Sequence, residues 1–127
     1  MQKTIKFYLI LMTGLLVMSS FAVTDSPASM KLKMPKKIDA IVQSKCYGCH
    51  NSNAKFDKPK QKLNFDELST LSPDKQLEKM KDFASVVEEG SMPPSRFLEN
   101  NPDKKLTDDE VAKLKKWTSK AVKKLSK

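Results

Sequence analysis

Cysteine and histidine are scarce in this chain, which has two cysteines and one histidine among its 127 residues. Cys46 and Cys49 are three positions apart, so they cannot build a disulfide scaffold, and a bridge between them would close a tiny loop that stabilises little. With His50 they supply three metal ligands and no fourth, which argues against a structural zinc site. If this small chain has a covalent staple, it must involve Cys46 and Cys49.

Strand signals are missing as well. No segment alternates apolar and polar residues convincingly and no segment repeats, whereas apolar residues recur at spacings of three and four. A thioredoxin-like redox pair needs a βαβ context, which this pattern does not provide. The length leaves room for one domain, and the fold class that we predict is all-α, with three to four helices.

Acidic residues are few relative to basic ones: 15 Asp and Glu stand against 24 Lys and Arg, for a net charge of +9. Aromatic residues make up 7% of the chain and do not interleave with the lysines, so no nucleic acid partner is expected. Most of the lysines are explained as solvated helix faces. The excess of positive charge nevertheless favours an acidic protein partner, because it steers the encounter.

No charged residue occurs between Lys6 and Asp25, and residues 7–18 are an apolar run. The run is shorter than the roughly 20 residues that span a bilayer, it follows two lysines, and small residues precede position 22. Residues 1–22 are therefore predicted to be a cleaved signal peptide, which makes the domain periplasmic or secreted. The alternative is an uncleaved anchor, and membrane association is expected only in that case.

The mature chain is predicted to consist of a flexible leader at 23–34 and one domain at 35–127. A first helix is expected from Pro35 toward Cys46, because apolar residues recur there at helical spacing. Residues 50–62 are polar and lysine-rich, and they predict a loop.

Two later helices carry clear end signals. The first is expected to start at Ser72, whose hydroxyl can cap it, and to end at Gly90. Prolines then predict an extended loop at 91–95. The last helix is expected to begin with a capping box, in which Thr107 and Glu110 satisfy each other's backbone amides.

The spacing of Cys46, Cys49 and His50 has a mechanistic explanation. Two thiols one helical turn apart can reach the two vinyl groups of one porphyrin and form thioethers, and the next residue is then held beneath the iron as its axial ligand. We therefore predict one covalent haem c, attached through Cys46 and Cys49, with His50 as the proximal iron ligand. A single histidine excludes bis-histidine ligation within the chain.

Four methionines follow residue 22 and could ligate the iron on its other side. Met30 and Met34 fall in the expected leader, and Met80 lies on the apolar face of a predicted helix, where a core position is expected. Met92 lies beside two prolines that would hold a thioether in place. Met92 is therefore the predicted distal ligand, the alternative being that it only caps the core. A methionine ligand favours ferrous iron and suits electron transfer.

Two further residues receive predicted roles at the site. An axial histidine usually donates its other ring N–H to a backbone carbonyl. Pro59 is predicted to provide that carbonyl, since its loop must fold back under His50. Trp117 is expected to pack the last helix against the first helix or the haem edge.

The order of these motifs resembles class I c-type cytochromes and, more narrowly, the bacterial haem-binding domain family of secreted monohaem proteins. The resemblance implies Cys46 and Cys49 as attachment sites, His50 as proximal ligand and Met92 as distal ligand. That family often has a Pro-Trp-Tyr element shortly after the cysteine motif, which this chain lacks. The stretches that carry the resemblance are Cys46-Tyr47-Gly48-Cys49-His50-Asn51-Ser52-Asn53, Leu63-Asn64-Phe65, Glu89-Gly90-Ser91-Met92-Pro93-Pro94 and Lys105-Leu106-Thr107-Asp108-Asp109-Glu110 with Trp117.

The expected function is that of an electron carrier rather than an enzyme, because the chain has no second histidine to complete a distal acid–base pair. One alternative is a haem relay subunit of a membrane respiratory complex, which retention of residues 1–22 would favour. The other is an open-site haem sensor or peroxidase-type protein, in which Met92 does not ligate.

Overall fold

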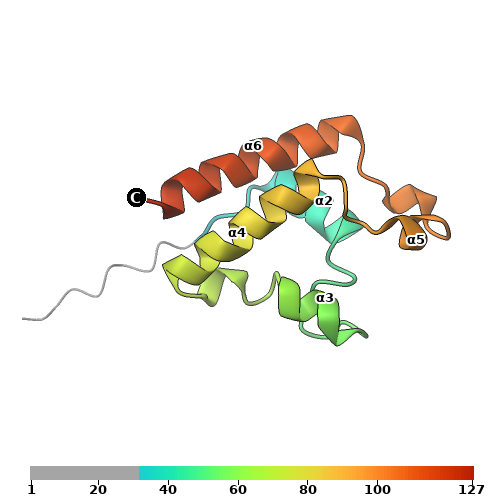
Figure 1. Cartoon of the computed structure of the whole chain (residues 1–127), viewed down its shortest axis with the longest axis horizontal. Coiled ribbons are helices and arrows are strands. Elements are labelled where there is room, and N and C mark those ends of the chain that lie inside the picture. Colours follow the sequence, from blue (N-terminus) through green and yellow to red (C-terminus); the bar gives the residue numbers. More distant parts are fainter. Residues whose placement is uncertain (1–31) are drawn as a thin grey trace, which may run out of the picture.

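The structure, a computed structural model, describes residues 32–127 and contains only helices, turns and loops in that part of the chain (Figure 1). The all-α fold class is confirmed. Two short helices bring the number of α-helices above the expected three to four. The elements in order are α2 (Lys36–Lys45), α3 (Asp57–Lys62), the 3₁₀ turn η1 (Leu68–Thr70), α4 (Pro73–Glu88), α5 (Ser95–Leu98), the 3₁₀ turn η2 (Pro102–Lys104) and α6 (Asp108–Leu125).

Helices α4 and α6 form the centre of the domain and pack along each other, with α2 beside them (Figure 1). Met80 of α4 and Leu114 of α6 are completely buried in this core. Helix α2 presents Ile38, Ile41 and Val42 to the core, at the i, i+3, i+4 spacing of one helical face. None of the helices within residues 32–127 is long and apolar enough to cross a membrane.

The chain just before α2 belongs to the packed domain. Leu32 and Met34 are half-buried against the core, and the indole N–H of Trp117 donates to the carbonyl of Lys33 at 3.3 Å. Residues 32–34 were predicted to be flexible leader, and this part of the prediction is wrong because apolar side chains hold them down. The predicted signal peptide at 1–22 lies outside the described residues.

The predicted ends of the two long C-terminal helices are largely confirmed. The Thr107 hydroxyl accepts from the Glu110 amide at 3.2 Å, and the Glu110 carboxylate accepts from the Thr107 amide at 2.9 Å. Helix α4 ends at Glu88, and Gly90 follows its C-cap residue Glu89 with a φ of 64°, which suits glycine. The Ser72 hydroxyl makes no cap at the start of α4, contrary to the prediction; its backbone carbonyl accepts from the Gln76 amide instead, at 2.8 Å.

Two short helices were not predicted. Helix α3 lies within the segment 50–62 that was expected to be a loop, and α5 begins at Ser95, so the extended loop covers 91–94 only. Helix α3 buries no side chain and gives no apolar periodicity. Electrostatics support it instead: Asp57 lies in its first turn and pairs with Lys60 at 2.9 Å, which lowers the pKa of Asp57.

Candidate functional site

The cysteine–histidine motif forms a tight turn that continues from the end of α2. The Cys46 amide still donates to the Val42 carbonyl at 2.8 Å, and the His50 amide returns to the Cys46 carbonyl at 3.2 Å. Cys46 and Cys49 therefore lie on one turn, as their spacing predicted. Both thiols are half-buried and not bridged.

The Cys46 thiol is held in its neutral form. Burial raises its pKa to about 11, and the nearby charges of Glu110 and Cys49 act in the same direction. A thiol with this pKa is a poor thiolate ligand or nucleophile at neutral pH. Within residues 32–127 no cluster of three or more His, Cys, Asp and Glu could hold a metal ion. The raised pKa argues against a thioredoxin-type site, in which the pKa of the reactive cysteine is lowered.

The ring of His50 is oriented by one hydrogen bond. Its Nδ1 lies 2.9 Å from the backbone carbonyl of Leu63. A carbonyl oxygen only accepts, so Nδ1 carries the proton and Nε2 keeps its lone pair for a metal. The predicted role of Pro59 is wrong, because the Pro59 carbonyl accepts from the Leu63 amide at 3.0 Å to close α3. The loop does fold back under His50, but it does so one helical turn later than expected.

A second hydrogen bond holds the backbone of the same histidine. The Phe65 amide donates to the His50 carbonyl at 3.0 Å. The segment 63–65 therefore grips His50 at a ring nitrogen and at a main-chain oxygen, which restricts both the position and the rotation of the imidazole.

Asp66 secures this segment against the motif. Its carboxylate accepts from the Tyr47 hydroxyl at 2.7 Å and from the Ser52 amide at 2.9 Å. The two bonds lower the pKa of Asp66, and the shared bond raises the pKa of Tyr47. Asn64 adds a bond from its side-chain amide to the Ser52 hydroxyl at 3.0 Å. Leu63, Asp66 and Tyr47 were not singled out from the sequence, because a side chain that bonds across a loop leaves no periodic signal.

Aromatic rings connect the motif to the centre of the domain. His50, Phe65, Phe83 and Trp117 follow one another in edge-on pairs, with centroid distances of 6.3, 5.8 and 6.1 Å. Such pairs add about 0.5–1.5 kcal/mol each beyond the area that they bury. Trp117 packs α6 against Phe83 of α4, where packing against the first helix or a haem edge was expected.

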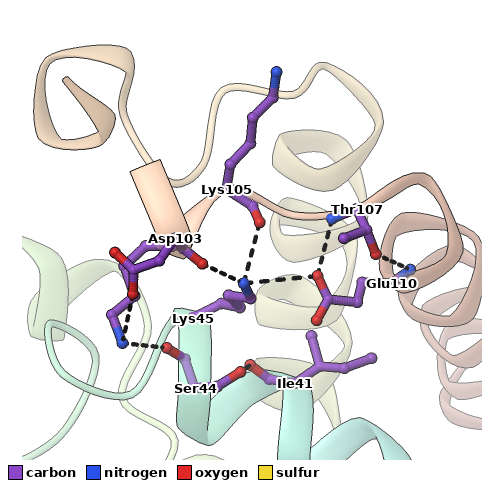
Figure 2. A network of polar contacts seen from close by, with 8 residues as sticks. Ile41, Ser44, Lys45, Asp103, Lys105, Thr107 and Glu110 are labelled. Atoms are coloured by element: carbon purple, nitrogen blue, oxygen red, sulfur yellow. Dashed lines mark hydrogen bonds and ion pairs between the residues drawn. The ribbon is translucent and has the colours of Figure 1, made fainter. Parts of the chain in front are cut away.

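A lysine beside the motif ties α2 to the start of α6 (Figure 2). The Lys45 ammonium donates to the carbonyls of Asp103 and Lys105 at 2.5 and 3.2 Å and lies 4.0 Å from the Glu110 carboxylate. Lys104 returns a bond to the Ser44 carbonyl at 3.0 Å. We call Lys45 with these carbonyl groups the lysine clasp. Because α5 packs on η2, the clasp also holds the segment after Met92 near the motif.

The three methionines of the described chain differ in accessibility. Met80 is 0% exposed, which confirms its predicted core position, and Met34 is half-buried against the core. Met92 is 39% exposed, next to a buried Pro93. The predicted role of Met30 falls outside the described residues. Met92 is thus the most accessible of the three thioethers, although its bond to iron stays a prediction.

The residues present fit a haem. Phe56 and Phe97 are 63% and 36% exposed, so with Met92 they leave large apolar side chains uncovered before α3, within α5 and in the loop before α5. Apolar surface of this kind is stabilised when a flat apolar group covers it. A cavity of about 260 Å³ elsewhere is lined by Met34, Tyr47 and Phe65, among others, and does not reach the cysteines or His50.

An all-helical domain with these groups at one end of α2 defines a small haem-binding protein. The sequence profile of the haem-binding domain family matches residues 55–120, just over half of the chain. The chain belongs to this family. No curated protein and no solved structure matches it. The match begins after His50, so covalent attachment is argued from the cysteine motif itself.

Proposed function

We propose that this protein is an exported c-type cytochrome that carries electrons through one covalently bound haem. The observation that carries the proposal is the hydrogen bond from His50 Nδ1 to the Leu63 carbonyl, which leaves Nε2 as a ligand beside two unbridged thiols. Membership of a haem-binding family supports the cofactor. Export is supported by the apolar run of residues 7–18 after two lysines.

In this proposal each residue of the site has a defined task. Cys46 and Cys49 attach the porphyrin, so that a thin helical core cannot lose it, and His50 Nε2 binds the iron. The Leu63 carbonyl polarises the imidazole and makes it a stronger ligand. The Met92 thioether would be the second protein ligand of the iron and would favour the ferrous state. Bound haem supplies a one-electron ferric–ferrous couple.

The proposed partner is an acidic redox protein. Exposed Phe56 follows Lys55, whose ammonium lies 5.7 Å from the ring centroid, and exposed Phe97 follows Arg96. These cationic side chains stand beside the rings that the haem is proposed to cover, so they favour a transient interface with a partner of opposite charge, which steering brings into register.

The visible spectrum tests the proposal. Protein matured in an exporting host should keep its haem in acidified acetone and show a low-spin spectrum with a methionine–iron charge-transfer band, whereas Cys46→Ala/Cys49→Ala should lose the covalent haem. A covalent, high-spin haem that binds carbon monoxide would overturn Met92 and favour the sensor or peroxidase-type alternative. Absence of covalent haem from the unsubstituted protein would overturn the central claim.

A further inference from the structure

The C-terminal half of α6 is a one-sided cationic surface. Residues 111–127 contain no Asp or Glu. Five exposed lysines of α6 fall within an arc of roughly 100° when successive residues are turned by about 100°, and one of them, Lys113, pairs with Asp109. We call the other four, together with Lys127 just after the helix, the basic face: Lys116, Lys120, Lys123, Lys124 and Lys127.

The basic face is not neutralised by the described part of the domain. Two other lysines of α6 have carboxylate partners: Lys115 pairs with Glu88 at 3.4 Å and Lys113 pairs with Asp109. Among residues 32–127, no carboxylate lies within 4.0 Å of a basic-face ammonium. Neighbouring like charges repel one another. An anionic surface that covers these lysines relieves this repulsion, which favours binding.

The start of the described chain is fixed beside this face. The Trp117 indole holds the Lys33 carbonyl, and a hollow of about 130 Å³ lies between this segment and α6. Apolar Leu32, Trp117 and Ala121 line the hollow together with the cationic Lys33, Lys120 and Lys124. The hollow thus combines apolar walls with ammonium groups, which can receive an anionic headgroup next to apolar atoms.

The sequence upstream favours a membrane as the occupant. Residues 19–31 separate the apolar run at 7–18 from Leu32. Even fully extended, this connecting stretch spans at most about 45 Å. Residues 26–38 contain four lysines and no acidic residue, so this stretch carries a net positive charge. In the alternative in which residues 1–22 are retained as an anchor, the chain meets the bilayer through residues 7–18, and this short connection brings the basic face to the same surface.

We propose that the basic face binds the headgroups of anionic phospholipids. The cysteine motif is tied to the other end of α6 through Lys45 and Glu110, and an 18-residue helix is about 27 Å long. The membrane-bound domain therefore turns its haem-binding end away from the lipid and toward a soluble redox partner. The proposal does not depend on the covalent chemistry of that end.

Lysine footprinting of the exported holoprotein tests the orientation. Amine acetylation is measured by mass spectrometry with vesicles of phosphatidylglycerol and phosphatidylcholine, and again with phosphatidylcholine alone. We expect the reactivity of basic-face lysines to fall at least several-fold with the anionic vesicles only, while Lys58, Lys60 and Lys62 of α3 stay reactive. Equal protection on α3, or no protection on α6, would overturn the proposal.

Matched charge variants make the test independent of footprinting. Lys116→Gln/Lys120→Gln/Lys124→Gln should weaken co-sedimentation with anionic vesicles at 0.1 M salt by about tenfold to 100-fold, since each lysine near such a surface contributes to binding. Lys55→Gln/Lys58→Gln/Lys62→Gln removes the same charge from the other end and should have little effect. Equal losses in the two variants, or binding to an acidic protein without binding to vesicles, would count against the lipid. Covalent haem in both variants separates this result from a failure of the proposed function.

Discussion

Two atoms of His50 are held from outside the turn of the cysteine motif. The ring nitrogen and the main-chain oxygen both bond to the segment 63–65, which Asp66 fastens to Tyr47 and Ser52. The strength of the imidazole as a ligand is thereby linked to a loop that lies more than ten residues away in the sequence.

Removing the Asp66 charge should loosen this grip. In Asp66→Asn one of the two accepted bonds is lost or weakened, so the Leu63 carbonyl is held less firmly and the imidazole becomes a weaker donor. We expect the reduction potential to rise and the Nδ1 proton to exchange faster with solvent, as measured by electrochemistry and NMR. Asp57→Asn, an exposed carboxylate of α3, is the control. An unchanged potential would show that Asp66 acts on stability alone.

The same carboxylate predicts an acid limit to stability. The folded pKa of Asp66 lies below its unfolded value, so its contribution is fully present above the unfolded pKa and is lost as the pH falls through the folded pKa. The melting temperature of the wild type should therefore drop as the pH falls below about 4, the usual pKa of an unfolded aspartate. Asp66→Asn should show a smaller drop over that range, and identical profiles would contradict the assignment.

Met92→Ala tests the distal position. Loss of a thioether that ligates iron should lower the potential and produce a high-spin form that binds carbon monoxide. Met34→Ala is the matched control, because Met34 packs against the core. If Met92→Ala leaves the spectrum unchanged, another group fills the sixth position.

At the scale of helices and turns, the domain relies on local end signals and on the lysine clasp. The capping box of α6 should contribute about 1 kcal/mol, the usual effect of an N-cap hydroxyl. Thr107→Ala should reduce the free energy of unfolding by this amount in urea denaturation, whereas Thr107→Ser should largely preserve it. A loss in the serine variant as large as in the alanine variant would rule out the hydroxyl as the cause.

Lys45→Met should weaken the contact that the clasp makes between the end of α2 and the turn before α6. It keeps the aliphatic stem but removes the ammonium that bonds Asp103 and Lys105, so the turn around η2 becomes mobile. We expect faster hydrogen exchange at residues 99–106 and a loss of about 1–2 kcal/mol of stability. Lys58→Met, on exposed α3, should change neither quantity.

The sequence was informative wherever one pattern repeats within an element. The capping box of α6 and the turn of the cysteine motif both follow from spacing and were predicted. Helix α3 was missed because it buries nothing, and Leu63 was missed because a backbone carbonyl has no residue-specific signature. The clasp joins residues about 60 positions apart, and only the packing of α2 beside α6 brings them together.

At the scale of the molecule, the domain is a small helical core that its cofactor should complete. The exposed Phe56, Met92 and Phe97 have no protein cover, and a chain of this size buries a modest fraction of its apolar surface. Cys46→Ala/Cys49→Ala should therefore fold poorly, with reduced helical circular dichroism and a lower melting temperature than the holoprotein. A variant that lacks haem and melts at the holoprotein temperature would show that the core suffices alone.

The lysine clasp has a consequence for how this molecule can be altered. Its acceptors at positions 103 and 105 are main-chain oxygens, so the bond survives any replacement of those two side chains that preserves the turn. Side chains of another charge or size, or one that carries a reactive label, can be introduced there without opening the junction between α2 and α6. These two positions are thus natural places to engineer a new recognition surface close to the cysteine motif, while the architecture stays unchanged.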